Sequence, residues 1–237
     1  MVMEKLRNIS NKIITPLAKK FQGSHVSPNI ITILGLVAMI VASTWTAVVG
    51  YSRFHPAFLC ITIAFIFLSG FFDLLDGGVA KFTGQKTKFG GVLDSTCDRY
   101  SDAFFIIGLI FGNYLNPPPY IPLPNPAAWG VVIGFSGIVG AFMTSYVRSR
   151  AEIEGVKMAG VGWIERGERL SVFFLGTIAE AFASANGVYG VMFWTFLVLV
   201  VLMHLTAFQR IHHARKELKL VDAASARKQD TTAVTTT

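Results

Sequence analysis

The chain has 237 residues, of which 52% are hydrophobic and 15% are charged, and its mean hydropathy is +0.53. Soluble domains carry about 25% charged residues, so this composition excludes an ordinary soluble protein and predicts that much of the surface faces lipid. The net charge of +7 would suit either a nucleic acid or an anionic membrane. Because of how the charge is distributed along the chain, we favour the membrane and expect no nucleic-acid partner.

The first 25 residues differ from the chain that follows, because basic and apolar side chains share them. Between residues 4 and 21, apolar residues recur every three or four positions, and lysine or arginine residues fall between them. On a helix this spacing gives one apolar face and one basic face. We therefore predict that residues 1–25 form an N-terminal amphipathic helix at the membrane surface, which is compatible with packing against the protein's own spans.

Six stretches of chain are long and apolar enough, or nearly so, to cross a bilayer, which takes about 20 residues. The third and fifth are short, but the polar N-terminal end of the third can lengthen it. The sequence therefore predicts an all-α, polytopic membrane protein with six transmembrane helices in a domain of residues 26–215. Residues 216–237 are polar and threonine-rich, and they predict a disordered tail. The six predicted spans are residues 30–50, 56–75, 100–114, 128–147, 170–185 and 188–208.

Charge placement indicates which side of the membrane the termini face. With six spans, all of the 21 Lys and Arg residues except Arg53 fall on the side of the two termini. They lie in the N-terminal segment, in residues 76–99, in residues 148–169 and after residue 208. The positive-inside rule places this side in the cytoplasm. We predict a multi-pass protein of the cell membrane with both termini and its active site on the cytoplasmic side.

Four aspartates lie around the turn between the second and third predicted spans. Asp73 and Asp76 are three positions apart, and Asp94 and Asp98 are four apart, so each pair projects from one face of a helix. The hairpin that joins the spans would bring both faces together at the cytoplasmic boundary of the membrane. Isolated aspartates often cap helix ends in water, but four at helical spacing beside apolar spans are costly and indicate function.

Clustered carboxylates repel one another unless cations lie among them, and carboxylate oxygens favour Mg²⁺ or Mn²⁺. Two such ions suit phosphoryl transfer, because they neutralise a diphosphate and orient the attacking and leaving oxygens. Gly77 would let a nucleotide approach the backbone closely, and Lys81 would meet a phosphate as a point charge. The predicted ligands of the two ions are Asp73, Asp76, Asp94 and Asp98.

This pattern resembles the signature of the CDP-alcohol phosphotransferases: Asp-x-x-Asp-Gly-x-x-Ala-Arg, eight residues, then Gly-x-x-x-Asp-x-x-x-Asp. Lys81 stands where the family has arginine, which keeps the positive charge but not the planar, bidentate contact with phosphate. The resemblance extends over about residues 1–215 and includes the six-span layout. The matching residues are Asp73, Asp76, Gly77, Ala80, Gly90, Asp94 and Asp98.

The resemblance implies a membrane enzyme that transfers a phosphatidyl-type group from a CDP-lipid to an alcohol and releases CMP. It implies that the first three aspartates bind metal, that Asp98 is the general base for the acceptor hydroxyl and can also touch metal, and that the enzyme is a homodimer. Residues at the start of the first span would lie beside the cytidine, although a proline there also fits a plain helix start. The implied donor residues are Pro28, Asn29, Thr32, Asp73, Asp76, Gly77, Ala80, Lys81 and Gly90.

The charged segment between the fourth and fifth predicted spans indicates the acceptor. Residues 145–170 read SYVRSRAEIEGVKMAGVGWIERGERL and are similar to segments of phosphatidylinositol-phosphate synthases and archaetidylinositol-phosphate synthases. Inositol phosphate carries a dianionic phosphate, which arginines bind well. The positive-inside bias or binding of lipid head groups is the simpler explanation of these cations. The predicted acceptor-phosphate residues are Arg148, Arg150, Arg166, Arg169 and Arg210.

Neighbouring carboxylates are expected to have supporting roles. Glu152, Glu165 and Glu168 lie close to these arginines in the sequence, and we expect them to orient the guanidinium groups through salt bridges. Asp102 lies one helical turn beyond Asp98. We expect it to pair with a polar neighbour rather than to bind metal.

Alternatives stay open for the acceptor, the donor lipid and the class of protein. The same chemistry serves glycerol phosphate, serine or free inositol, and among these glycerol phosphate also brings a phosphate for the arginines. The donor is CDP-diacylglycerol or CDP-archaeol, whose apolar tails the sequence does not distinguish. A cation transporter also holds carboxylates among its spans, but it usually places them near the bilayer midplane.

Overall fold

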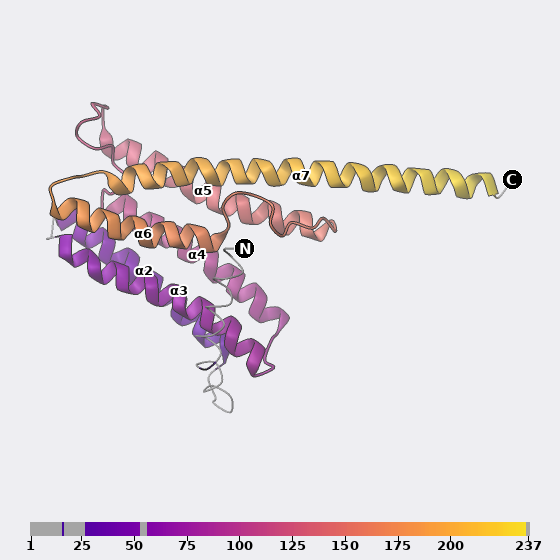
Figure 1. The fold of residues 1–237 in the computed structure, drawn as a ribbon, viewed down its shortest axis with the longest axis horizontal. Coiled ribbons are helices and arrows are strands. Elements are labelled where there is room, and N and C mark those ends of the chain that lie inside the picture. The colour runs from indigo at the N-terminus through magenta and orange to yellow at the C-terminus, as the bar shows by residue number, and fades with distance from the viewer. Residues whose placement is uncertain (1–15, 17–26, 53–55, 236–237) are drawn as a thin grey trace.

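The computed structural model describes residue 16 and residues 27–52 and 56–235, and within these residues every regular element is a helix (Figure 1). The all-α class is therefore confirmed. The predicted amphipathic helix of residues 1–25 lies outside the described residues, apart from residue 16. The elements are α2 (Pro28–Ser52), the short 3₁₀ helix η1 (Pro56–Phe58), α3 (Leu59–Phe82), α4 (Lys88–Phe111), α5 (Pro126–Ile153), α6 (Arg166–Ala185) and α7 (Val191–Thr235).

Four of the described helices are long and apolar enough to cross a membrane. These segments are Pro28–Gly50, Leu59–Phe82, Pro126–Ile153 and Val191–Asp222. α4 and α6 are also long, but both carry several charged residues, which lower their hydropathy. The four apolar helices establish an integral membrane protein. The count of six spans stays a prediction for α4 and α6.

The helices extend beyond the predicted spans at the ends that carry charged residues. α3 continues to Phe82, past residue 75, and α4 begins at Lys88 rather than at residue 100. Thr87 starts α4 as an N-cap, because its side chain accepts a hydrogen bond from the Gly90 amide at 2.9 Å. Apolar content alone does not detect these polar turns, which are the turns that carry the aspartates.

α7 differs most from its predicted extent, because it continues as one helix to Thr235 (Figure 1). Residues 216–237 were expected to be a disordered tail, yet the structure has helix through residue 235. The physical reason is local: after Gly190 the chain contains neither glycine nor proline, and alanine, lysine, arginine and leucine favour helix. The yellow C-terminal half of α7 projects well beyond the other helices in Figure 1.

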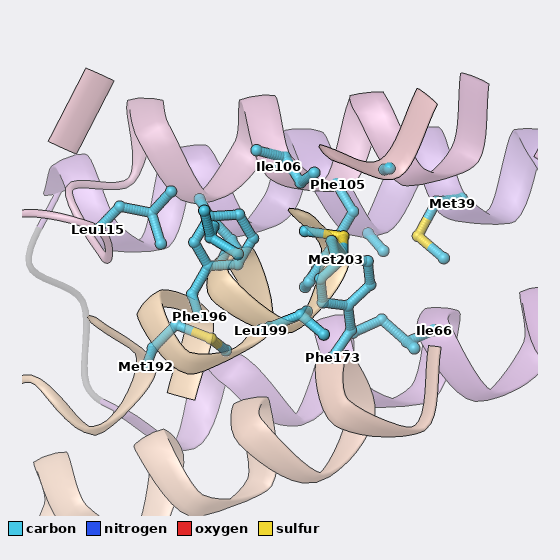
Figure 2. Close-up of a cluster of buried hydrophobic side chains, with 14 of the residues drawn as sticks. Met39, Ile66, Phe105, Ile106, Leu115, Phe173, Met192, Phe196, Leu199 and Met203 are labelled. Atoms are coloured by element: carbon cyan, nitrogen blue, oxygen red, sulfur yellow. The ribbon is translucent and has the colours of Figure 1, made fainter. Parts of the chain in front are cut away.

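The core lies where α4, α6 and α7 meet, and aromatic rings fill it (Figure 2). The ring of Phe173 on α6 lies between Phe105 of α4, at 4.9 Å between centroids, and Phe196 of α7, at 6.4 Å. Met39 of α2 and Ile66 of α3 belong to the same buried cluster. Ala141 of α5 also belongs to it, so six of the described helices share one core.

α4 packs against α2 at very short distance through two glycines. A Cβ atom at Gly108 would lie 2.5 Å from the carbonyl oxygen of Ser43, and one at Gly112 would lie 2.7 Å from that of Thr46. Small residues four apart allow this approach of helix backbones in membranes. Because α2 also packs against α3, α2 holds α3 and α4 in one unit of three helices.

Candidate active site

Three of the four predicted metal ligands converge. Asp73 of α3 and Asp94 and Asp98 of α4 each offer a carboxylate oxygen, and these oxygens lie within 4.8 Å of one another. The spacing of four residues puts Asp94 and Asp98 on one face of α4, and the short turn after Phe82 directs this face toward Asp73 of α3. The predicted convergence of α3 and α4 is therefore confirmed for these three side chains.

Asp76 lies beside this cluster and is tied to α2. It is 6% exposed, and its Oδ2 accepts a hydrogen bond from the Thr32 hydroxyl at 2.5 Å. Asp73, Asp76 and Asp98 also line one narrow pocket together with Thr32. The fourth aspartate therefore shares the site, but its carboxylate is outside the group of three.

The guanidinium of Arg166, in the first turn of α6, joins the two aspartate-bearing helices. Its Nη1 donates to Asp73 Oδ1 at 2.6 Å, and its Nη2 lies 2.9 Å from Asp98 Oδ1. Sequence reasoning assigned this arginine to the acceptor phosphate. The structure instead places its charge directly on two predicted metal ligands.

The donor set of this cluster fits a hard divalent cation. Three carboxylates this close together raise one another's energy strongly unless positive charge lies among them. Oxygen ligands of this type are the ones that Mg²⁺ and Mn²⁺ take. Asp73, Asp94 and Asp98 are thus the residues that would hold an ion, with Asp76 next to them.

A cavity of about 960 Å³ opens from Asp98 toward α5, α6 and α7. Four of the five predicted acceptor arginines line it: Arg148, Arg166, Arg169 and Arg210. Arg150 is not part of its wall. That side chain is half exposed and pairs with Glu154 at 2.6 Å, so the structure does not bring it to the site.

Two of the cavity arginines are buried and also bind the protein itself. Arg169 is 3% exposed and donates to the carbonyl oxygen of Ala141 and to the Thr144 hydroxyl. Arg210, also 3% exposed, donates to the carbonyl oxygens of Thr144 at 2.6 Å and Val161 at 2.9 Å. Both side chains therefore fasten α5 to α6 and α7 while they face the cavity.

The predicted supporting carboxylates are largely in place. Glu152 accepts from Arg148 Nε at 3.0 Å, and Glu165 lies 3.9 Å from Arg148 Nη1. Asp102 pairs with Arg169 at 3.2 Å, which confirms that it has a polar partner on another helix. Glu168 behaves differently, because its side chain accepts from the Glu165 amide at 2.7 Å and caps the start of α6.

Two cations of the cavity wall were missed as site residues. Arg99 lies 3.6 Å from Asp98, and Lys88 is at the start of α4. The sequence analysis counted both only as cytoplasmic positive charge. The available signal was the position of Arg99, since it directly follows the last aspartate of the signature.

Contacts at the start of α2 join several of the predicted donor residues. A Cβ at Gly90 would lie 3.0 Å from Thr87 Oγ1 and 3.2 Å from Asn29 Oδ1, so only glycine fits between these oxygens without displacing them. Thr32 bonds both Asp76 and the Pro28 carbonyl. A Cβ at Gly77 would meet nothing within 4 Å, which leaves its backbone open to a ligand. Ala80 is half-buried and Lys81 is exposed at the end of α3.

The family model for CDP-alcohol phosphatidyltransferase matches residues 25–203, a stretch that contains every aspartate of the site. The chain belongs to this family. It is therefore a phospholipid-synthesising transferase of the membrane. This membership sets aside the cation transporter.

Curated relatives cover nearly the whole chain. The archaetidylinositol phosphate synthase of Pyrococcus horikoshii is 29% identical over 92% of this chain and all of its own length. The phosphatidylinositol phosphate synthase of Mycobacteroides abscessus is 32% identical over 86% of this chain and 84% of its own length.

Solved structures show the same fold in a mycobacterial relative. The phosphatidylinositol phosphate synthase of Mycobacterium tuberculosis with CDP-DAG bound has a TM-score of 0.68, 28% identity, and coverage of 86% of this chain and 94% of its own. The same synthase in complex with manganese and citrate has a TM-score of 0.67 and 28% identity, covering 85% of this chain and 88% of its own.

Proposed function

We propose that this enzyme transfers the phosphatidyl-type group of a CDP-lipid to inositol phosphate and releases CMP, with Mg²⁺ or Mn²⁺ as cofactor. The observation that carries the proposal is that the carboxylate cluster and the arginine-lined cavity lie next to each other. A carboxylate cluster suited to divalent ions adjoins, through Asp98, a cavity lined by arginines. The relatives named inositol phosphate synthases support the choice of acceptor.

The charge of the cavity wall favours an anionic acceptor. Six cationic side chains and four carboxylates line it, so the wall carries a net positive charge. Guanidinium groups bind phosphate with strong, charge-assisted hydrogen bonds. The cations are Lys88, Arg99, Arg148, Arg166, Arg169 and Arg210, and the carboxylates are Asp98, Asp102, Glu152 and Glu165.

Asp98 is placed to act as the general base in this proposal, because it belongs to both the carboxylate cluster and the cavity wall. The acceptor hydroxyl oxygen forms a bond to the lipid-bearing phosphorus of the CDP-lipid, and the bond from that phosphorus to the CMP oxygen breaks. The hydroxyl proton passes to a carboxylate oxygen of Asp98. CMP leaves with the bonding electron pair.

Two divalent ions are the expected cofactors, and Asp73, Asp76, Asp94 and Asp98 would hold them. Bound there, such ions neutralise the diphosphate of the donor and stabilise the charge of the leaving group. The relative solved with manganese supports this assignment. The donor's cytidine and diphosphate would lie at the start of α2, against Asn29, Thr32 and Gly90, with Pro28, Gly77, Ala80 and Lys81 nearby. The relative solved with CDP-DAG supports the donor.

The cytoplasmic orientation and a homodimer are further parts of the proposal. The orientation rests on the positive-inside bias of the loops, and it places the site where a water-soluble acceptor meets a lipid tail. The homodimer rests on the family resemblance alone.

An acceptor panel tests this function. The purified enzyme is supplied with a CDP-lipid and, in separate reactions, inositol phosphate, glycerol phosphate, serine or free inositol, and CMP release is measured. We expect kcat/KM to be highest for inositol phosphate and release to be lost in Asp98→Asn. A higher kcat/KM for glycerol phosphate would show that glycerol phosphate, rather than inositol phosphate, is the acceptor. Full activity of Asp98→Asn would contradict the proposed active site.

Arg148 and Arg150 provide a matched test of the acceptor cavity. Both lie on α5 and both pair with a glutamate four residues later, but only Arg148 lines the cavity. Loss of a charged hydrogen bond costs about 1.5–3 kcal/mol, so Arg148→Gln should raise the KM for inositol phosphate about tenfold or more. Arg150→Gln should leave this KM within about twofold, and equal effects would count against the cavity as the acceptor site.

A further inference from the structure

Arg166 makes contacts that its expected role in the acceptor site does not explain. Its two terminal nitrogens lie 2.6 Å from Asp73 Oδ1 and 2.9 Å from Asp98 Oδ1. Both carboxylates belong to the group of three whose oxygens lie within 4.8 Å of one another. One guanidinium therefore pairs with two members of the cluster and joins the start of α6 to α3 and α4.

A divalent ion on these aspartates would need the same oxygens. Mg²⁺ coordinates carboxylate oxygens directly, at about 2.0–2.1 Å, and Mn²⁺ takes the same oxygen ligands. An ion at that distance would lie within a few ångströms of the guanidinium, and even two unit positive charges 4 Å apart repel by about 4 kcal/mol at a partly buried site. The ion and the guanidinium therefore compete for Asp73 and Asp98.

The displaced side chain has space to turn into the cavity. Arg166 lines the cavity of about 960 Å³ as well as the narrow aspartate pocket. Its Nε is buried and has no hydrogen-bond partner among the described residues. The capping box of Glu165 and Glu168 fixes the backbone at the start of α6, so the guanidinium can turn while its Cα stays in place.

We propose that Arg166 is a displaceable counter-ion: divalent ions release it from Asp73 and Asp98, and the freed guanidinium then completes the binding site for the acceptor phosphate. The release of Arg166 from the two carboxylates requires only that metal binds there, whereas its binding to the acceptor phosphate rests on the proposed function. Metal ions and acceptor phosphate then bind with positive coupling, and this coupling is reciprocal.

The proposal is tested by titrating Mn²⁺ into the purified full-length enzyme and reading bound metal by electron paramagnetic resonance, with and without inositol phosphate. In the wild type, inositol phosphate should raise the Mn²⁺ affinity about tenfold, within the usual range of such couplings. Arg166→Gln should bind Mn²⁺ about tenfold more tightly than the wild type without acceptor, and the effect of inositol phosphate should vanish.

Two further variants separate competition from general charge. Arg148→Gln removes a cation from the same cavity without touching the aspartates, so its Mn²⁺ affinity without acceptor should stay close to that of the wild type. Arg166→Lys keeps the charge but places it on one nitrogen without the planar fork that reaches both carboxylates, and its affinity should lie between those of wild type and Arg166→Gln. Thermal unfolding of each variant controls for folding.

The outcomes distinguish this inference from the proposed function. If the wild type binds Mn²⁺ and Arg166→Gln binds it with equal or weaker affinity, only the counter-ion role is overturned. Coupling that persists in Arg166→Gln would overturn the link to the acceptor. Wild-type enzyme that binds no Mn²⁺ would overturn the metal site and both proposals with it.

Discussion

Gly90 is a residue whose role follows from two distances. A Cβ there would meet Thr87 Oγ1 at 3.0 Å and Asn29 Oδ1 at 3.2 Å, whereas a Cβ at the neighbouring Gly91 would meet nothing within 4 Å. Both positions are helical, so alanine gains about the same helix propensity, up to about 1 kcal/mol, at each. Only at Gly90 does the new methyl group press on residues expected beside the donor.

We therefore predict that Gly90→Ala raises the KM for the CDP-lipid several-fold and has a lower Tm than Gly91→Ala. Steady-state CMP release and thermal unfolding in detergent give the two readouts. Indistinguishable donor KM values for these two variants would show that the close approach of Asn29 to Gly90 does not matter for donor binding.

For single residues, contacts between side chains close along one helix could be predicted from the sequence. Contacts that depend on how helices pack could not. The convergence of Asp94 and Asp98 follows from their spacing of four residues. The contact of Arg166 with Asp73 crosses 93 residues, and which arginine reaches which carboxylate depends on how α6 packs against α3. No pattern within either segment contains that information.

Helix α6 is fixed to α4 by a buried ion pair. Arg169 Nη2 lies 3.2 Å from Asp102 Oδ2, and both residues are at most 5% exposed. This pair lies one turn from the contact between Arg166 and Asp98 on the same two helices, so it sets the register of the active-site contact. Removal of one partner leaves a buried charge without compensation, which typically costs about 3–5 kcal/mol.

We predict that Asp102→Asn and Arg169→Met each destabilise the protein by about 3 kcal/mol or more, and that the double variant loses less than the sum. Unfolding in detergent measures all four proteins of this double-mutant cycle. Additive losses would mean that the two side chains do not interact in the folded enzyme.

The lengths of the elements show why helix ends were the least predictable part of the fold. Predicted spans began and ended with apolar runs, but α3 and α4 continue through turns that hold Asp76, Lys81 and Asp94. These helices carry polar residues at the positions where hydropathy predicts that a membrane span ends. α7 exceeds its predicted span because nothing in its sequence stops a helix.

The described residues form four plainly apolar helices and two long helices, α4 and α6, that carry much of the proposed active site. The sequence predicted six spans and found the third and fifth weakest, and these correspond to α4 and α6. Most of their charged residues lie in the carboxylate cluster or the cavity wall, and these residues lower the hydropathy of α4 and α6. The all-α class and the overall order of helices could be predicted because apolar length dominates in the remaining four.

The orientation of the molecule leads to a labelling prediction. In a background that lacks Cys60 and Cys97, Leu123→Cys in the segment between α4 and α5 should react with a membrane-impermeant maleimide on intact cells. Gln85→Cys in the turn between α3 and α4 should react only after the membrane is opened. The reverse pattern would place the active site on the outer face and contradict the positive-inside assignment.

The most direct test of the account is anomalous diffraction from crystals of the enzyme grown with Mn²⁺ and a CDP-lipid. We predict manganese peaks between the carboxylates of Asp73, Asp94 and Asp98, within bonding distance of their oxygens, and loss of these peaks in Asp94→Asn. With donor bound, the lack of any manganese peak at these three carboxylates would contradict the metal site on which the proposed transfer depends.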